Sequence, residues 1–190
     1  MPRGRRLVPV SEDTIEELSI IARRTGMTLP ELVESILSHA LRVLRSRDDV
    51  ASILASSTIM ADIFRLGASP APLGSLGGIL ETTNDNLFDK FVSESSSLAR
   101  LVAASVRARG INPRDGLIGL VRAWFPSLAL DVITNEDSNG RIVAASPLLS
   151  GSKLRQYVSS VLVSIVEGIG YRIVELKDEP GLVLILFSQK

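Results

Sequence analysis

The chain has 190 residues, of which 45% are hydrophobic and 22% are charged, a composition typical of a folded globular protein. Its 21 basic and 21 acidic residues cancel, so the overall charge does not indicate a polyanionic partner. The lack of cysteine excludes disulfide bonds and thiolate metal sites. The single histidine, His39, excludes a multi-histidine metal site within one chain. We therefore predict no metal and no cofactor.

The beginning of the chain carries arginines but only a four-residue apolar run before the first acidic residues. This pattern does not predict a signal peptide. No stretch approaches the roughly 18 apolar residues that a membrane-spanning helix needs. We therefore expect a cytoplasmic protein without a membrane partner.

Residues 5–26 predict a strand followed by a helix. The stretch Arg5–Val10 is short and contains β-branched residues, and Ser11 after it is a good helix N-cap. Acidic residues then fill the first helical turn, where the helix dipole favours them. Apolar residues recur at helical spacing up to Gly26, the predicted C-terminal stop: Ile15, Leu18, Ile21 and Ala22.

A second helix is predicted directly after this turn. Thr28 is its N-cap, Glu31 completes a capping box, and Pro30 is tolerated in the first turn. The helix then carries a wide apolar stripe, formed by Leu32, Val33, Ile36, Leu37, Ala40, Leu41 and Leu44. His39 lies off this stripe and is interpreted as a surface residue.

The middle of the chain is predicted to be helical with one interruption. Helices are expected over Asp48–Leu66, over about Asn84–Arg109 and over Arg114–Trp124. The glycine-rich stretch Gly67–Gly78 is predicted to be a loop. It lacks the lysine and the strand context of a phosphate-binding loop.

The last third of the chain predicts a small ββαββ module. Strand-like runs at Leu130–Asn135 and Arg141–Ala145 precede a helix at Ser152–Ile169, and Tyr171–Leu176 and Leu182–Phe187 follow it. The last of these strands is apolar on both faces, so it is either central in the sheet or covered by a partner. The predicted fold class is α+β, with segments 1–46, 47–126 and 127–190.

No arrangement of residues in the sequence predicts catalysis. No nucleophile has an identifiable base. The acidic pairs Glu136–Asp137 and Asp178–Glu179 are interpreted as solvated turn residues. We therefore predict a protein that is not an enzyme.

The N-terminal strand, helix, glycine turn and helix resemble the ribbon-helix-helix family of transcription regulators, which includes the CopG-, Arc- and MetJ-type repressors. The resemblance covers about 40 of the 190 residues without a gap. In this family two copies pair their strands and share one core, so the resemblance implies an obligate homodimer, with higher oligomers also possible. The implied dimer core is Val8, Val10, Leu18, Leu32, Val33, Ile36 and Leu37.

The resemblance also implies that double-stranded DNA is a partner. The paired strands enter the major groove, and the start of the second helix holds a phosphate. The implied DNA-contacting residues are Arg3, Arg5, Arg6, Leu7, Pro9, Thr28 and Leu29. Arg23 and Arg24 are further candidates for outer contacts. Residues 1–47 carry eight arginines and six acidic residues, a net charge of +2.

This sequence departs from the family pattern at the strand. Leu7 and Pro9 fall on outward positions and offer few hydrogen bonds, while Arg6 falls on an inward position. A one-residue slip would turn Arg6 and Val8 outward but would disturb the helix register. Pro30 also removes one N–H group from the start of the second helix.

Three hypotheses for the function follow. The first is a homodimeric transcription regulator that holds DNA mainly through its arginines. The alternative is a non-catalytic dimeric scaffold that keeps this fold only to dimerise. A third hypothesis makes the C-terminal module a small-molecule sensor or an oligomerisation device.

Overall fold

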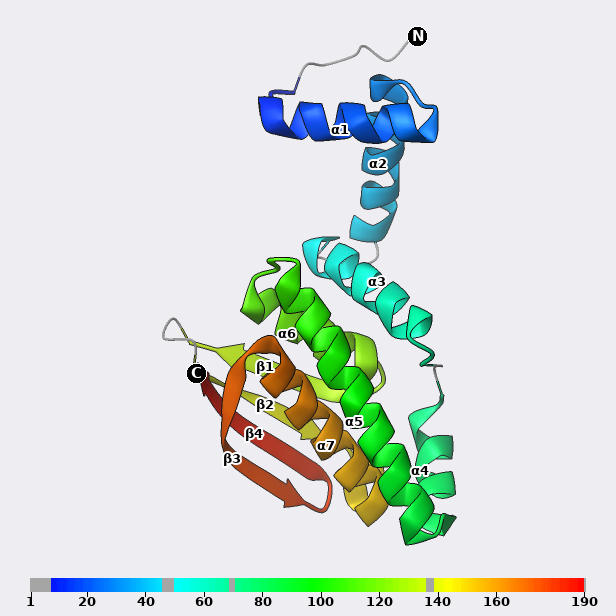
Figure 1. Cartoon of the computed structure of the whole chain (residues 1–190), viewed down its shortest axis with the longest axis vertical. Helices are drawn as coiled ribbons and strands as arrows, with labels where there is room; N and C mark the ends of the chain where they lie inside the picture. The colour runs from blue at the N-terminus through cyan, green and yellow to red at the C-terminus, as the bar shows by residue number, and fades with distance from the viewer. Residues whose placement is uncertain (1–7, 46–49, 69–70, 136–138, 190) are drawn as a thin grey trace. The chain divides into compact units, whose positions relative to one another are not determined.

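A computed structural model describes residues 8–45, 50–68, 71–135 and 139–189. The chain divides into two compact units, Met1–Val50 and Ala51–Lys190. The described residues form seven α-helices and one four-stranded antiparallel sheet near the C-terminus, so the predicted α+β class is confirmed (Figure 1).

The first unit consists of α1 (Glu12–Thr25) and α2 (Leu29–Leu44). The Ser11 side chain accepts a hydrogen bond from the backbone N–H of Thr14, as an N-cap does. Gly26 ends α1 with a left-handed backbone, φ 71°, that favours glycine. Both predicted signals for the ends of α1 are therefore confirmed.

The second unit begins with four helices. They are α3 (Val50–Arg65), α4 (Leu73–Thr82), α5 (Asp85–Ala108) and α6 (Pro113–Trp124). The Asn84 side chain caps the start of α5, and the Asn112 side chain caps the start of α6. The helices predicted from apolar periodicity in this region are confirmed.

The prediction of a loop over Gly67–Gly78 is wrong in its second half, where α4 begins at Leu73. Glycine normally weakens a helix, but here Gly77 is buried against α7. A Cβ atom at Gly77 would lie 2.9 Å from Cδ2 of Leu154. Close packing against a second helix therefore outweighs the low helix propensity of the sequence.

The ββαββ order predicted for the C-terminal module is confirmed. The strands are β1 (Ala129–Thr134), β2 (Gly140–Ala145), β3 (Tyr171–Glu179) and β4 (Leu182–Gln189), and α7 (Ser152–Ile169) lies between the two hairpins. A short 3₁₀ turn precedes α7. The strand order β1-β2-β4-β3 makes β4 central, which explains its apolar residues on both faces.

The core of the second unit surrounds α7. Figure 1 shows α7 and α5 on the same side of the sheet. The buried residues of α7 lie around most of its circumference, as in a helix covered on all sides: Leu154, Tyr157, Val158, Ser159, Val161, Leu162, Ser164, Ile165, Val166, Gly168 and Ile169. Phe125, after α6, is buried with its ring edge-on to Tyr157, at a centroid distance of 5.9 Å.

Gly168 permits the close approach of α5 to α7. A Cβ atom there would lie 2.6 Å from Cβ of Ala103 and 2.9 Å from the carbonyl oxygen of Arg100. We expect Gly168→Ala to lower the free energy of unfolding of this unit by about 1–3 kcal/mol, because backbone atoms of α5 must move. Urea unfolding followed by the fluorescence of Trp124, the single tryptophan, measures this change.

Gly78→Ala is the matched control, since nothing lies within 4 Å of the added Cβ atom on α4. This variant should be more stable by about 0.5–1 kcal/mol, because alanine favours the helix. Equal stability of the two variants would contradict the role of Gly168.

Candidate dimer and nucleic-acid interface

The N-terminal unit buries little of its own apolar surface. In the part of this unit whose burial is described, the buried hydrophobic residues are Ala22 on α1 and Leu32 on α2. The two helices cross near the start of α2 (Figure 1). The large hydrophobic residues that stay exposed are Val8, Val10, Ile15, Ile20, Ile21, Met27, Ile36, Leu37, Leu41 and Leu44. Two helices with so small a core are not stabilised by their mutual packing alone.

The predicted dimer-core residues are mostly uncovered in one chain. Leu32 is buried and Leu18 and Val33 are half-buried. Ile36 and Leu37 are 45% and 54% exposed. Val8 and Val10 are also exposed. The single chain therefore leaves most of the apolar stripe of α2 open to solvent.

The predicted strand is only partly within the described residues. Arg3, Arg5, Arg6 and Leu7 lie outside them. Residues 8–10, including Pro9, are exposed and form no strand in the single chain. A short isolated strand has no partner for its backbone hydrogen bonds, so one chain alone does not test this prediction.

The start of α2 forms the predicted capping box. The backbone N–H of Thr28 donates to Oε2 of Glu31 at 2.9 Å, and the backbone N–H of Glu31 donates to Oγ1 of Thr28 at 3.4 Å. The backbone N–H and the hydroxyl of Thr28 both donate to the Glu31 carboxylate, and they hold the pKa of Glu31 below its ordinary value. A carboxylate therefore stands at the helix end that the resemblance assigns to a phosphate. Leu29, beside it, is half-buried.

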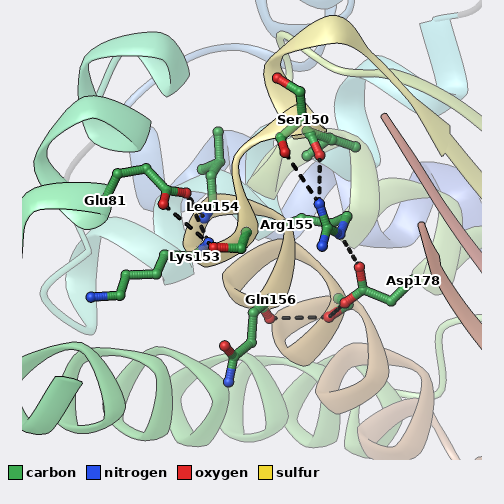
Figure 2. Close-up of polar contacts among 10 residues, drawn as sticks. Glu81, Ser150, Lys153, Leu154, Arg155, Gln156 and Asp178 are labelled. Carbon is green, nitrogen blue, oxygen red and sulfur yellow. Dashed lines mark hydrogen bonds and ion pairs between the residues drawn. The ribbon is translucent and has the colours of Figure 1, made fainter. Parts of the chain in front are cut away.

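A polar cluster at the start of α7 was missed by the sequence analysis (Figure 2). The Glu81 carboxylate, at the end of α4, accepts hydrogen bonds from the backbone N–H groups of Lys153 at 2.8 Å and Leu154 at 3.3 Å. Glu81 therefore caps α7 from another helix, because Gly151 at the cap position has no side chain. A Cβ atom on Gly151 would lie 2.6 Å from Oε1 of Glu81.

The same cluster joins α7 to β3. Arg155 donates to the carbonyl oxygens of Leu149 and Ser150, each at 3.3 Å, and forms an ion pair with Asp178 (Figure 2). The second carboxylate oxygen of Asp178 accepts a hydrogen bond from Ser159 at 3.3 Å. The interpretation of Asp178 as a solvated turn residue is therefore wrong. Since backbone N–H groups bind the Glu81 carboxylate and Arg155 pairs with Asp178, we interpret the cluster as structural.

Comparisons of the chain with protein families, characterised proteins and solved structures find no match. None of the helices in the described part of the chain combines the length and the hydrophobicity that a membrane span needs. Function is therefore inferred from the residues of this chain.

The capping box predicts a pH-dependent stability. The pKa of Glu31 is lower in the folded state than its ordinary value of 4.5 in the unfolded state. The ionised carboxylate therefore stabilises the fold fully at pH values above 4.5, and this stabilisation is lost as the pH falls through the pKa of the folded state. We expect Glu31→Gln to lower the melting temperature at pH 7 and to have a smaller effect at pH 3. Circular dichroism at 222 nm measures both.

Glu34→Gln provides the control, because Glu34 is an exposed glutamate on the same helix. A decrease in melting temperature that is as large at pH 3 as at pH 7 would contradict the role given to the Glu31 carboxylate.

Proposed function

We propose that the protein is an obligate homodimer formed through its N-terminal unit, and that the dimer binds double-stranded DNA as a transcription regulator. The observation that carries this proposal is the apolar stripe of α2, which is largely uncovered in the single chain. Ile36, Leu37, Leu41 and Leu44 all remain exposed on this helix.

A second copy supplies the cover that the stripe lacks. Burying a fully exposed leucine or isoleucine side chain contributes roughly 1.5–3 kcal/mol. The four residues are 44–56% exposed in the single chain, so covering them contributes about half of this value per residue. A two-fold axis brings the same stripe from both copies together. Pairing of residues 5–10 from two chains would also give each strand its hydrogen-bond partner and cover Val8 and Val10.

The arginines near the N-terminus support DNA as the partner of this dimer. Arg3, Arg5 and Arg6 give six guanidinium groups per dimer, within a segment whose net charge is +2 over residues 1–47. Arg23 and Arg24 add exposed positive charge at the end of α1. Acidic residues occupy the first turn of α1, and Glu31 occupies the start of α2. We therefore assign the DNA contacts to the arginines rather than to Thr28 and Leu29.

Leu37→Glu tests the dimer. We expect it to weaken dimerisation at least about 100-fold, because burying an unpaired charge costs several kcal/mol. Analytical ultracentrifugation over a range of concentrations measures the dissociation constant. His39→Glu places the same charge on the exposed side of α2 and should leave the dimer intact. A monomeric unsubstituted protein, or equal effects of both variants, would contradict the proposal.

Replacing Arg3, Arg5 and Arg6 together with alanine tests the DNA contact. Fluorescence anisotropy with random and genomic duplexes should show micromolar or tighter binding by the unsubstituted protein, with a log–log salt slope on the order of −5. The triple variant should lose this binding and remain dimeric. Absence of binding by the unsubstituted protein at about 50 mM salt would rule out the DNA role.

A dimeric scaffold is the second candidate, and the carboxylate of Glu31 at the start of α2 favours it. Ile20 and Met27 are exposed apolar residues on the same unit and fit a protein partner better than a phosphate backbone. This candidate predicts a stable dimer without DNA affinity. The two measurements above therefore separate the candidates.

A further inference from the structure

A cleft in the second unit gathers most of the aromatic residues of the chain. Its volume is about 470 Å³, and α3, α4, α5, α7 and the end of α6 line it. The chain has eight aromatic residues, and five of them line this cleft: Phe64, Phe91, Trp124, Phe125 and Tyr157. We call this feature the aromatic cleft.

Two of these five rings, Phe125 and Tyr157, are buried in the core, whereas Phe91 and Trp124 are half-buried and Phe64 is exposed. The buried residues elsewhere in this unit are mainly Leu, Ile, Val and Ala. Protein interiors normally close to crystal-like packing density, with few voids larger than a water molecule. A cleft of this size lies instead in the range of pockets that hold small organic ligands, roughly 300–1,000 Å³.

A hydrogen-bonding group lies in the aromatic wall. The hydroxyl-bearing side chains of Tyr157 and Ser95 both line the cleft. Burial raises the pKa of Tyr157 above its ordinary value, and the neighbouring side chains of Trp124 and Ser95 offset only part of this effect. This hydroxyl is therefore neutral at physiological pH. The ring of Tyr157 lies 5.1 Å from that of Phe91, centroid to centroid. An apolar surface with a few polar atoms in it is typical of a ligand site.

The charge of the lining excludes anionic ligands. Glu94 is the charged residue among those described along the cleft, and its side chain is 69% exposed, 3.9 Å from Lys90. No lysine or arginine is among the described lining residues. An anion would therefore find no countercharge there, and a desolvated unpaired charge is strongly disfavoured.

We propose that the aromatic cleft binds an uncharged, mainly apolar, ring-containing small molecule that carries one hydrogen-bonding group. Rings of the ligand pack against the aromatic walls, and its polar group reaches the hydroxyls of Tyr157 and Ser95. This site is separate from the residues assigned to dimerisation and to DNA. Its test therefore gives the same answer whether or not the proposed function holds.

The single tryptophan makes binding directly measurable in the full-length protein. The probe is N-phenyl-1-naphthylamine, an uncharged two-ring-system amine that absorbs where tryptophan emits. We expect saturable binding with one site per chain, seen as quenching of Trp124 and an increase in probe emission. Its 8-sulfonate, anilinonaphthalene sulfonate, has the same rings and a negative charge, and should bind at least about tenfold more weakly.

Two variants, each with one alanine replaced by phenylalanine, locate the binding site. Ala71 is exposed and lines the cleft, so Ala71→Phe adds bulk at its edge without entering the core. We expect this variant to weaken binding of the neutral probe at least about tenfold. Ala104→Phe adds the same ring at an exposed position of α5 that does not line the cleft, and should bind as the unsubstituted protein does.

Circular dichroism and thermal unfolding first establish that both variants are folded. Three results would overturn the proposal: no saturable signal with the neutral probe, equal affinity for the sulfonated probe, or equal affinity of the folded Ala71→Phe and Ala104→Phe variants. The comparison of the two probes on the unsubstituted protein decides the question even if Ala71→Phe does not fold.

Discussion

The burial of α7 is the constraint on which the second unit depends. This helix packs on the sheet and is covered by α5, so its backbone and side chains are removed from water around most of its circumference. Gly168 lets α5 approach closely at one end. At the other end, the Glu81 carboxylate accepts the hydrogen bonds that water would otherwise satisfy. A helix buried in this way needs both close packing and hydrogen-bond partners at its N-terminus, because unsatisfied N–H groups and voids each lower stability.

The helix α4 connects this constraint to the aromatic cleft. Its last turn carries Glu81, which caps α7, while Leu73 and Leu76 in its first turns line the cleft. Gly77 between them packs on Leu154. One short helix therefore holds a wall of the proposed ligand site and the polar cluster of Figure 2. Rigid support behind a binding site limits the entropy lost when a ligand binds.

The N-terminal unit differs from the second unit in having well-defined helices but very little core. Its helices have well-formed ends, with Ser11, Gly26 and the Thr28–Glu31 capping box, but almost no core of their own. Local signals define where the helices begin and end, and a second chain is proposed to supply the packing. Folding and dimerisation of such a unit are coupled, so its apparent stability depends on protein concentration.

Apolar periodicity and capping residues in the sequence predicted six of the seven helices and both hairpins, because these features depend on residues a few positions apart. They did not predict α4, in which Gly77 packs closely against Leu154 of α7. They also did not predict the Arg155–Asp178 pair or the aromatic cleft, whose residues lie far apart in the chain. Only the tertiary structure decides such contacts, since chain folding brings these residues together. The dimer core and the arginine contacts remain predictions, because they join two molecules rather than two parts of one chain.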